Sequence, residues 1–120
     1  MAGVIAAVDD LFFGAKIQET AQRLCLPLSL VRSPGELMGL ARASHPALVI
    51  FDLNATGCEP LAAIRQLKAD PDLRAIPTLG FFSHVQRELR AAATEAGCDR
   101  VVARSAFTAE LAEILRQHAT

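Results

Sequence analysis

Carboxylate side chains follow two apolar runs of this chain, at points where strands are expected to end. Asp9 and Asp10 directly follow the run Gly3–Val8. Asp52 directly follows the run Ala47–Phe51. If the two runs are neighbouring strands, which lie about 4.8 Å apart, the three carboxylates converge at one edge of a sheet. Like charges so close raise one another's pKa unless a cation neutralises them.

Magnesium is the cation that these oxygen ligands favour, since it takes one or two carboxylates, a backbone carbonyl and waters. Such a site suits phosphoryl transfer, because the metal neutralises charge while a carboxylate accepts the group. The alternative is that Asp9 and Asp10 cap a helix and Asp52 caps a loop, and caps of this kind contribute ~1 kcal/mol each. Three acids at two strand ends are less common by chance, so we favour the phosphoryl site.

Short apolar runs alternate with longer segments of helical periodicity along the whole chain, which predicts an α/β fold with a doubly wound parallel sheet. The expected strands are Gly3–Val8, Leu28–Val31, Ala47–Phe51, Ile76–Phe82 and Arg100–Ala103. The expected helices are Leu11–Cys25, Ser33–Ser44, Pro60–Ala69, Gln86–Ala96 and Thr108–His118. Ligands of such sheets bind beyond the carboxyl ends of the strands, where the acids are expected.

Composition limits the possible functions. With 120 residues and 52% hydrophobic content, the chain is expected to form one domain over residues 1–120, with no output domain. The balance of 12 basic against 13 acidic residues gives no basic field for a nucleic-acid partner. The apolar runs are far short of the ~20 residues of a membrane helix, and no secretory signal is visible, so we expect a cytoplasmic protein.

Other polar residues are given structural interpretations. Asp70 and Asp72 flank Pro71 and are expected to form a turn. The three cysteines lack metal or redox spacing and are expected to be reduced thiols. Cys25 and Cys98 are interpreted as small apolar residues at helix ends, and Cys58 as a conceivable reactive thiol near the acidic edge.

Four features together give a family resemblance: the Asp9-Asp10 pair, the single Asp52, Pro77 opening a strand, and Ala96-Gly97 closing a helix. This pattern resembles the receiver domain of bacterial response regulators, the CheY-like family, over essentially the whole chain. The resemblance implies a (βα)5 flavodoxin-like fold of five strands in the order 2-1-3-4-5. It also implies a signalling domain of two-component phosphorelays, with no enzymatic activity beyond self-phosphorylation and dephosphorylation.

The resemblance further implies roles for individual residues. Asp52 would accept a phosphoryl group from a sensor histidine kinase or a phosphotransfer domain. Asp9, Asp10 and Asp52 would hold Mg²⁺, together with the backbone carbonyl of Asn54. Contacts with a downstream protein would use the fourth helix, fifth strand and fifth helix, approximately residues 84–118.

Two positions depart from the family pattern. Receivers carry Thr or Ser at the position of Phe82, and Lys at the position of Arg104. A phenyl ring cannot donate a hydrogen bond, although a small bulge could turn the hydroxyl of Ser83 towards the pocket. Arg keeps the positive charge of Lys but presents it as a planar fork. His84 is placed near the rim, where it could tune the access of water to a phosphoaspartate.

Two rival interpretations remain. A pseudo-receiver would keep the fold and the acidic pocket and act as an interaction module without phosphorylation-dependent switching, as Phe82 and Arg104 suggest. A haloacid-dehalogenase-type phosphatase is the minor alternative, because Val49–Thr56 resembles the first motif of that family. The second acid of that motif is replaced by Asn54, and no late strand ends in paired acids.

Overall fold

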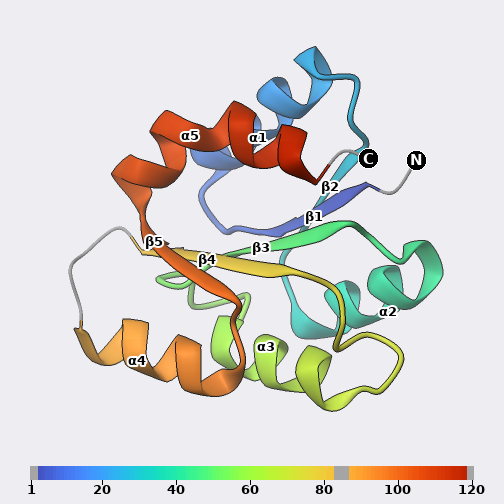
Figure 1. Cartoon of the computed structure of the whole chain (residues 1–120), viewed down its shortest axis with the longest axis vertical. Helices are drawn as coiled ribbons and strands as arrows, with labels where there is room; N and C mark the ends of the chain where they lie inside the picture. The colour runs from blue at the N-terminus through green and yellow to red at the C-terminus, as the bar shows by residue number, and fades with distance from the viewer. Residues whose placement is uncertain (1–2, 83–86, 119–120) are drawn as a thin grey trace.

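Five parallel strands form a sheet, in the order β2-β1-β3-β4-β5 (Figure 1). The computed structural model describes residues 3–82 and 87–118. The strands are β1 (Val4–Ala7), β2 (Leu28–Val31), β3 (Leu48–Asp52), β4 (Thr78–Phe82) and β5 (Arg100–Ala103). The predicted α/β class, doubly wound topology and strand order are therefore confirmed.

Helices cover both faces of the sheet. They are α1 (Leu11–Arg23), α2 (Pro34–Ser44), α3 (Pro60–Ala69), α4 (Arg87–Ala96) and α5 (Arg104–Gln117). Figure 1 shows α1 and α5 on one face and α2, α3 and α4 on the other. Each face buries its own apolar cluster against the sheet, as expected for strands that are apolar on both sides. No helix in the described ranges is long and apolar enough to cross a membrane.

Capping residues set the limits of α2 as the sequence predicts. The Ser33 hydroxyl oxygen accepts the backbone N–H of Glu36 at 3.1 Å, which stabilises the first turn. In a capping box, the Glu36 carboxylate would accept the N–H of Ser33. Here it accepts the N–H of Arg32, one residue earlier. His45 then takes a left-handed conformation with φ 45°, which ends the helix before Pro46.

Two predicted helix boundaries are wrong. Helix α1 ends at Arg23 rather than at Cys25, because Cys25 adopts a left-handed backbone with φ 56°. Cys25 is also exposed, which does not fit its interpretation as a small apolar residue, whereas Cys98 is buried. Helix α5 begins at Arg104 rather than at Thr108 and follows β5 without a loop.

Packing of Phe107 explains the early start of α5. Its ring is fully buried and stacks on Phe81 of β4, with ring centroids 4.7 Å apart. Phe13 of α1 completes the cluster, at 5.0 Å from Phe81 and 5.8 Å from Phe107. A loop before Phe107 would withdraw its ring from these contacts, so burial of the aromatic cluster favours helix directly after the strand.

Replacement of Gly80 by Ala is expected to destabilise the fold. A Cβ atom on Gly80 of β4 would lie 3.0 Å from three side-chain atoms of the buried Leu53. Overpacking of this kind costs about 1–3 kcal/mol. The measurement is the free energy of unfolding in urea.

The matched control is Gly39→Ala on the exposed surface of α2, where no atom lies within 4 Å of the new Cβ. Helix propensity predicts that this variant gains roughly 0.5–1 kcal/mol. Equal stability of the two variants would contradict the packing assigned to Gly80 and Leu53.

Candidate functional site

The carboxyl ends of β1 and β3 bring three acids to one edge of the sheet. The two strands are hydrogen-bonded neighbours, and Ala7 is paired with Phe51. Asp9 and Asp10 follow β1. Asp52 is the last residue of β3, whereas the sequence predicted it as the first residue after the strand. Asp52 is only 8% exposed. The sequence prediction that these three residues share one edge is consistent with this register.

Asp10 is the N-cap of α1 and also forms an ion pair. Its Oδ1 accepts the backbone N–H groups of Phe12 at 3.0 Å and Phe13 at 3.1 Å. Its Oδ2 accepts a hydrogen bond from Nη2 of Arg104 at 3.1 Å. The N–H of Phe13 and then the guanidinium of Arg104 lower the pKa of Asp10. The capping role considered for Asp10 is therefore present, alongside a contact that a cap alone does not need.

Asp9 does not cap the helix and instead ties β1 to the loop between β3 and α3. Its Oδ2 accepts the N–H of Gly57 at 3.0 Å, and its Oδ1 accepts the thiol of Cys58 at 3.2 Å. Burial, followed by the hydrogen bond to Asp9, raises the pKa of Cys58 to about 12. Since the thiolate is the reactive form, this environment argues against the reactive thiol considered for Cys58.

Asp52 is the most deeply placed acid of the edge. Its Oδ1 accepts the backbone N–H of Asn54 at 3.0 Å, while no hydrogen bond from residues 3–82 or 87–118 reaches Oδ2. Burial raises the pKa of Asp52, and the charges of Asp9 and Asp10 add to this effect. The N–H of Asn54 and the charge of Arg104 oppose it. Asp52 is thus a buried carboxylate with one oriented oxygen and one oxygen available to a ligand.

Arg104 lies at the pocket, where the family resemblance places it. Its guanidinium pairs with Asp10, and its Cζ stands 4.0 Å from the centroid of the Phe13 ring. A cation over an aromatic face at this distance is stabilised by the quadrupole of the ring. This role of Phe13 was not predictable from the sequence, because its helical spacing fitted a core residue equally well. Lys68 does not substitute for Arg104, because it binds Asp99 and two backbone carbonyls elsewhere in the fold.

Phe82 ends β4 beside Ala103 and is 8% exposed. A buried phenyl ring thus occupies the strand end where a hydroxyl was expected from the resemblance. Ser83 and His84, the other two residues assigned to this part of the pocket, lie outside the described residues. Their predicted roles stay predictions.

The carboxylate oxygens are ligands that Mg²⁺ prefers, but they are not arranged around a common metal position. In the described part of the chain, no three His, Cys, Asp or Glu side chains are grouped so as to hold a metal ion. Both oxygens of Asp10 are engaged, one by the helix N-terminus and the other by Arg104. A divalent ion bound to Asp10 would therefore share this carboxylate with the helix N-terminus and Arg104.

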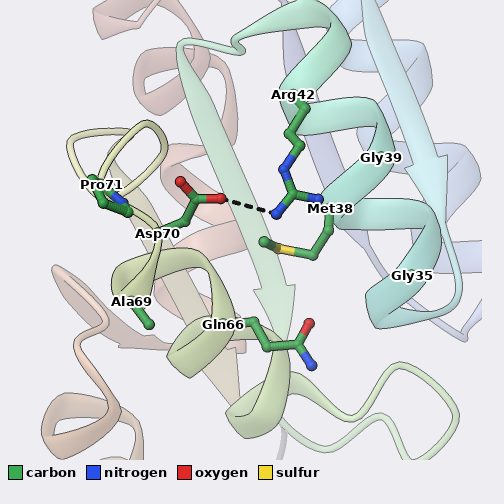
Figure 2. A pocket seen from close by; sticks show the side chains of 8 residues that line it. All are labelled: Gly35, Met38, Gly39, Arg42, Gln66, Ala69, Asp70 and Pro71. Atoms are coloured by element: carbon green, nitrogen blue, oxygen red, sulfur yellow. Dashed lines mark hydrogen bonds and ion pairs between the residues drawn. The ribbon is translucent and has the colours of Figure 1, made fainter.

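A separate groove of about 690 Å³ lies between α2 and α3 (Figure 2). At one end Arg42 pairs with Asp70 at 2.9 Å, and Asp70 also accepts the N–H of Asp72. These bonds, that of Asp72 first, lower the pKa of Asp70. The turn role expected for Asp70 and Asp72 is confirmed. None of the three strand-end acids lines this groove.

Comparison with solved structures identifies the architecture as the receiver fold of response regulators. A response regulator from Hahella chejuensis superimposes with a TM-score of 0.86 at 16% identity, covering 100% of this chain and 96% of that one. The phosphorylated cyanobacterial phytochrome response regulator RcpA gives 0.76 at 23% identity, covering 98% and 91%. The Mn²⁺-bound response regulator Rcp1 gives 0.76 at 16% identity, covering 95% and 91%.

These likenesses establish the fold. The chain has the CheY-like receiver fold, and its structural neighbours include response regulators and the signal receiver domain of a signal transduction histidine kinase. No protein-family model matches the sequence. No curated protein matches it either.

The raised pKa of Asp52 predicts a pH-dependent effect of Asp52→Asn on stability. The folded-state pKa of Asp52 lies above its unfolded-state value, so the protonated carboxyl favours the folded state. This stabilisation is present at low pH and is lost as pH rises through the folded-state pKa, where ionised Asp52 destabilises the fold. Asp52→Asn is therefore expected to raise the free energy of unfolding at pH 7. The gain should shrink as pH falls towards about 4, the ordinary carboxyl pKa. Urea unfolding at both pH values measures it.

Asp72→Asn serves as the control, since Asp72 is an exposed acid of the turn after α3. This variant should change stability little, and similarly at both pH values. If Asp52→Asn is less stable than the unmodified protein at pH 7, the unfavourable ionisation assigned to Asp52 is wrong.

Proposed function

We propose that this chain is a receiver that accepts a phosphoryl group on Asp52 and signals through contacts with other proteins. The observation that carries the proposal is the state of the Asp52 carboxylate at the end of the central strand β3. It is buried, one oxygen is oriented by the N–H of Asn54, and the second receives no hydrogen bond from the described residues. This arrangement suits a carboxylate nucleophile.

In the proposed reaction, Oδ2 of Asp52 forms a bond to phosphorus, and the bond between phosphorus and the donor atom breaks. The donor is a phosphohistidine of a sensor kinase or phosphotransfer domain, which keeps the electron pair of the broken bond. The N–H of Asn54 holds Oδ1 during the attack. Arg104 supplies a positive charge near enough to act on the ionisation of Asp52, and this charge would stabilise the phosphoryl oxygens.

Mg²⁺ is the proposed cofactor and would be held by Asp9, Asp10 and Asp52 with the backbone carbonyl of Asn54. Its chemistry would be to neutralise charge on the phosphoryl oxygens. The carboxylate set supports this assignment by donor type. The Mn²⁺-bound state of the structural neighbour Rcp1 agrees with a divalent ion in this fold.

The proposed output surface is formed by α4, β5 and α5. Arg87, Arg90 and Arg100 are exposed on α4 and at the start of β5. Basic side chains on a surface of this kind favour an acidic partner protein. Arg104, at the start of α5, connects this surface to the acidic pocket through its pair with Asp10.

Phosphorylation is tested by incubating the chain with Mg²⁺ and acetyl phosphate and measuring the intact mass. The mass is expected to increase by one phosphoryl group, and Asp52→Asn should abolish the increase because the nucleophilic oxygen is gone. Asp72→Asn is the matched control and should be labelled as fully as the unmodified protein. Labelling of the Asp52→Asn protein, or no labelling of the unmodified one, would refute the assignment.

A pseudo-receiver is the second candidate function, and two observations favour it. The ring of Phe82 occupies a strand end where the hydrogen bond to a phosphoryl group is expected. Arg104 pairs with Asp10 rather than with Asp52. Either feature could leave a phosphorylated pocket without an effect on the α4–β5–α5 surface.

Backbone amide NMR spectra with and without acetyl phosphate distinguish the two candidates. A switching receiver should show shifts in α5 as well as around Asp52, because Arg104 and Phe107 are on the same helix. We expect this wider pattern. Shifts confined to the residues around Asp52, in a sample shown to be phosphorylated by its mass, would establish the pseudo-receiver instead.

A further inference from the structure

Large apolar side chains are exposed on one side of the molecule, along α1 and β2. Among residues 3–82 and 87–118, the exposed large hydrophobic side chains are Leu11, Phe12 and Leu30. Phe12 is 92% exposed, and its neighbour Leu11 is 68% exposed. Adjacent exposed apolar side chains with charged residues around them are typical of an interaction surface.

The exposed face of α1 carries a stripe of residues that begins at Phe12. At intervals of four, seven and eleven residues, Phe12 is followed by Lys16, Glu19 and Arg23. At 3.6 residues per turn, these four side chains lie along one line of the helix, within about 60° of one another. All four are exposed, and Arg23 pairs with Glu19 at 2.6 Å. We call these four residues the α1 stripe.

The order of residues along the α1 stripe is self-complementary. Phe12 and Arg23 are equally far from the centre of the stripe, and Lys16 and Glu19 lie symmetrically between them. A twofold axis through this centre pairs two α1 helices antiparallel and exchanges such positions. Phe12 then faces Arg23 of the second copy, which is a cation–π pair. Lys16 faces Glu19 of the second copy, so positive and negative side chains alternate around the axis.

We propose that the α1 stripe binds a second copy of this chain, with the two α1 helices antiparallel. The occupant is a second copy because each group of the stripe finds its complement in the same stripe: the aromatic ring a cation, and the ammonium group a carboxylate. Each contact occurs twice by symmetry. The proposal goes beyond the function proposed above and does not depend on phosphorylation of Asp52.

The size of α1 limits the strength of this dimer. The helix has 13 residues and is about 20 Å long, so one helix pair forms a small interface. Stable interfaces bury about 1,200 Å² or more, and exposed charge pairs contribute little each. We therefore expect a weak dimer whose population rises with protein concentration.

Sedimentation equilibrium of the full chain, from about 10 µM to about 1 mM, measures the dimer. The unmodified protein is expected to change from monomer towards dimer across this range. Phe12→Ala should raise the dissociation constant about tenfold, because both cation–π pairs are lost. Circular dichroism checks that this variant keeps its fold, as expected for a side chain that is 92% exposed.

Charge reversal tests the antiparallel arrangement. Lys16→Glu places like charges opposite each other and should raise the dissociation constant about tenfold. Adding Glu19→Lys in the same chain restores opposite charges between the two copies, together with the net charge of the unmodified protein. This double variant should return the constant to within about threefold of the unmodified value.

Glu113→Lys on α5 is the matched control for Glu19→Lys alone. Both variants change the net charge by the same amount, and both break an exposed Glu–Arg pair within one helix, since Glu113 pairs with Arg116. Glu19→Lys should weaken the dimer as Lys16→Glu does. Glu113→Lys should leave the dissociation constant unchanged.

Three results would overturn the proposal. The first is an unmodified protein that stays monomeric up to about 1 mM. The second is a dimer that Phe12→Ala and Lys16→Glu leave unchanged, because it would form through another surface. The third is a double variant that dimerises no better than Lys16→Glu alone, because the antiparallel pairing would then be wrong. None of these measurements uses a phosphodonor, so the dimer and the phosphorylation of Asp52 fail separately.

Discussion

Neutralisation of the carboxylates at the ends of β1 and β3 is the constraint on which this molecule depends. Parallel neighbouring strands deliver Asp9, Asp10 and Asp52 to one edge, and the repulsion between them must be balanced. The protein does so with backbone N–H groups, a thiol and one guanidinium. Each of these partners comes from a different position in the chain, so the edge also joins α1, the loop after β3 and the start of α5.

The same contacts explain why the three acids are not equivalent. Asp10 lies at the positive end of α1 and beside Arg104, so its charged form is stabilised. Asp52 is buried, and its charged form is disfavoured. Environments that separate the pKa values of neighbouring carboxylates are typical of sites in which one acid reacts and another assists. The proposed nucleophile, Asp52, has a raised pKa, whereas the proposed metal ligand, Asp10, has a lowered pKa.

The fold was largely predictable from the sequence because its signals are local or periodic. The bounds of β2, β5 and α3 followed from apolar runs and turn residues. The strand order, which places β1 beside β3, followed from the resemblance to receiver domains. The start of α5 was not predictable, since it depends on the packing of Phe107 against residues distant in the sequence. Within the pocket, the residue types at Asp10 and Arg104 were visible, but their pairing across 94 positions was not.

The absence of a loop before α5 has an electrostatic consequence. Ala103 stands at the cap position of α5 and offers no side-chain hydrogen bond to the first N–H groups of the helix. The positive end of the dipole of α5 therefore remains at the carboxyl edge of the sheet, on the side from which Arg104 reaches Asp10. Part of the positive field at the acidic edge thus belongs to the backbone itself, and no substitution of the Arg104 side chain removes it.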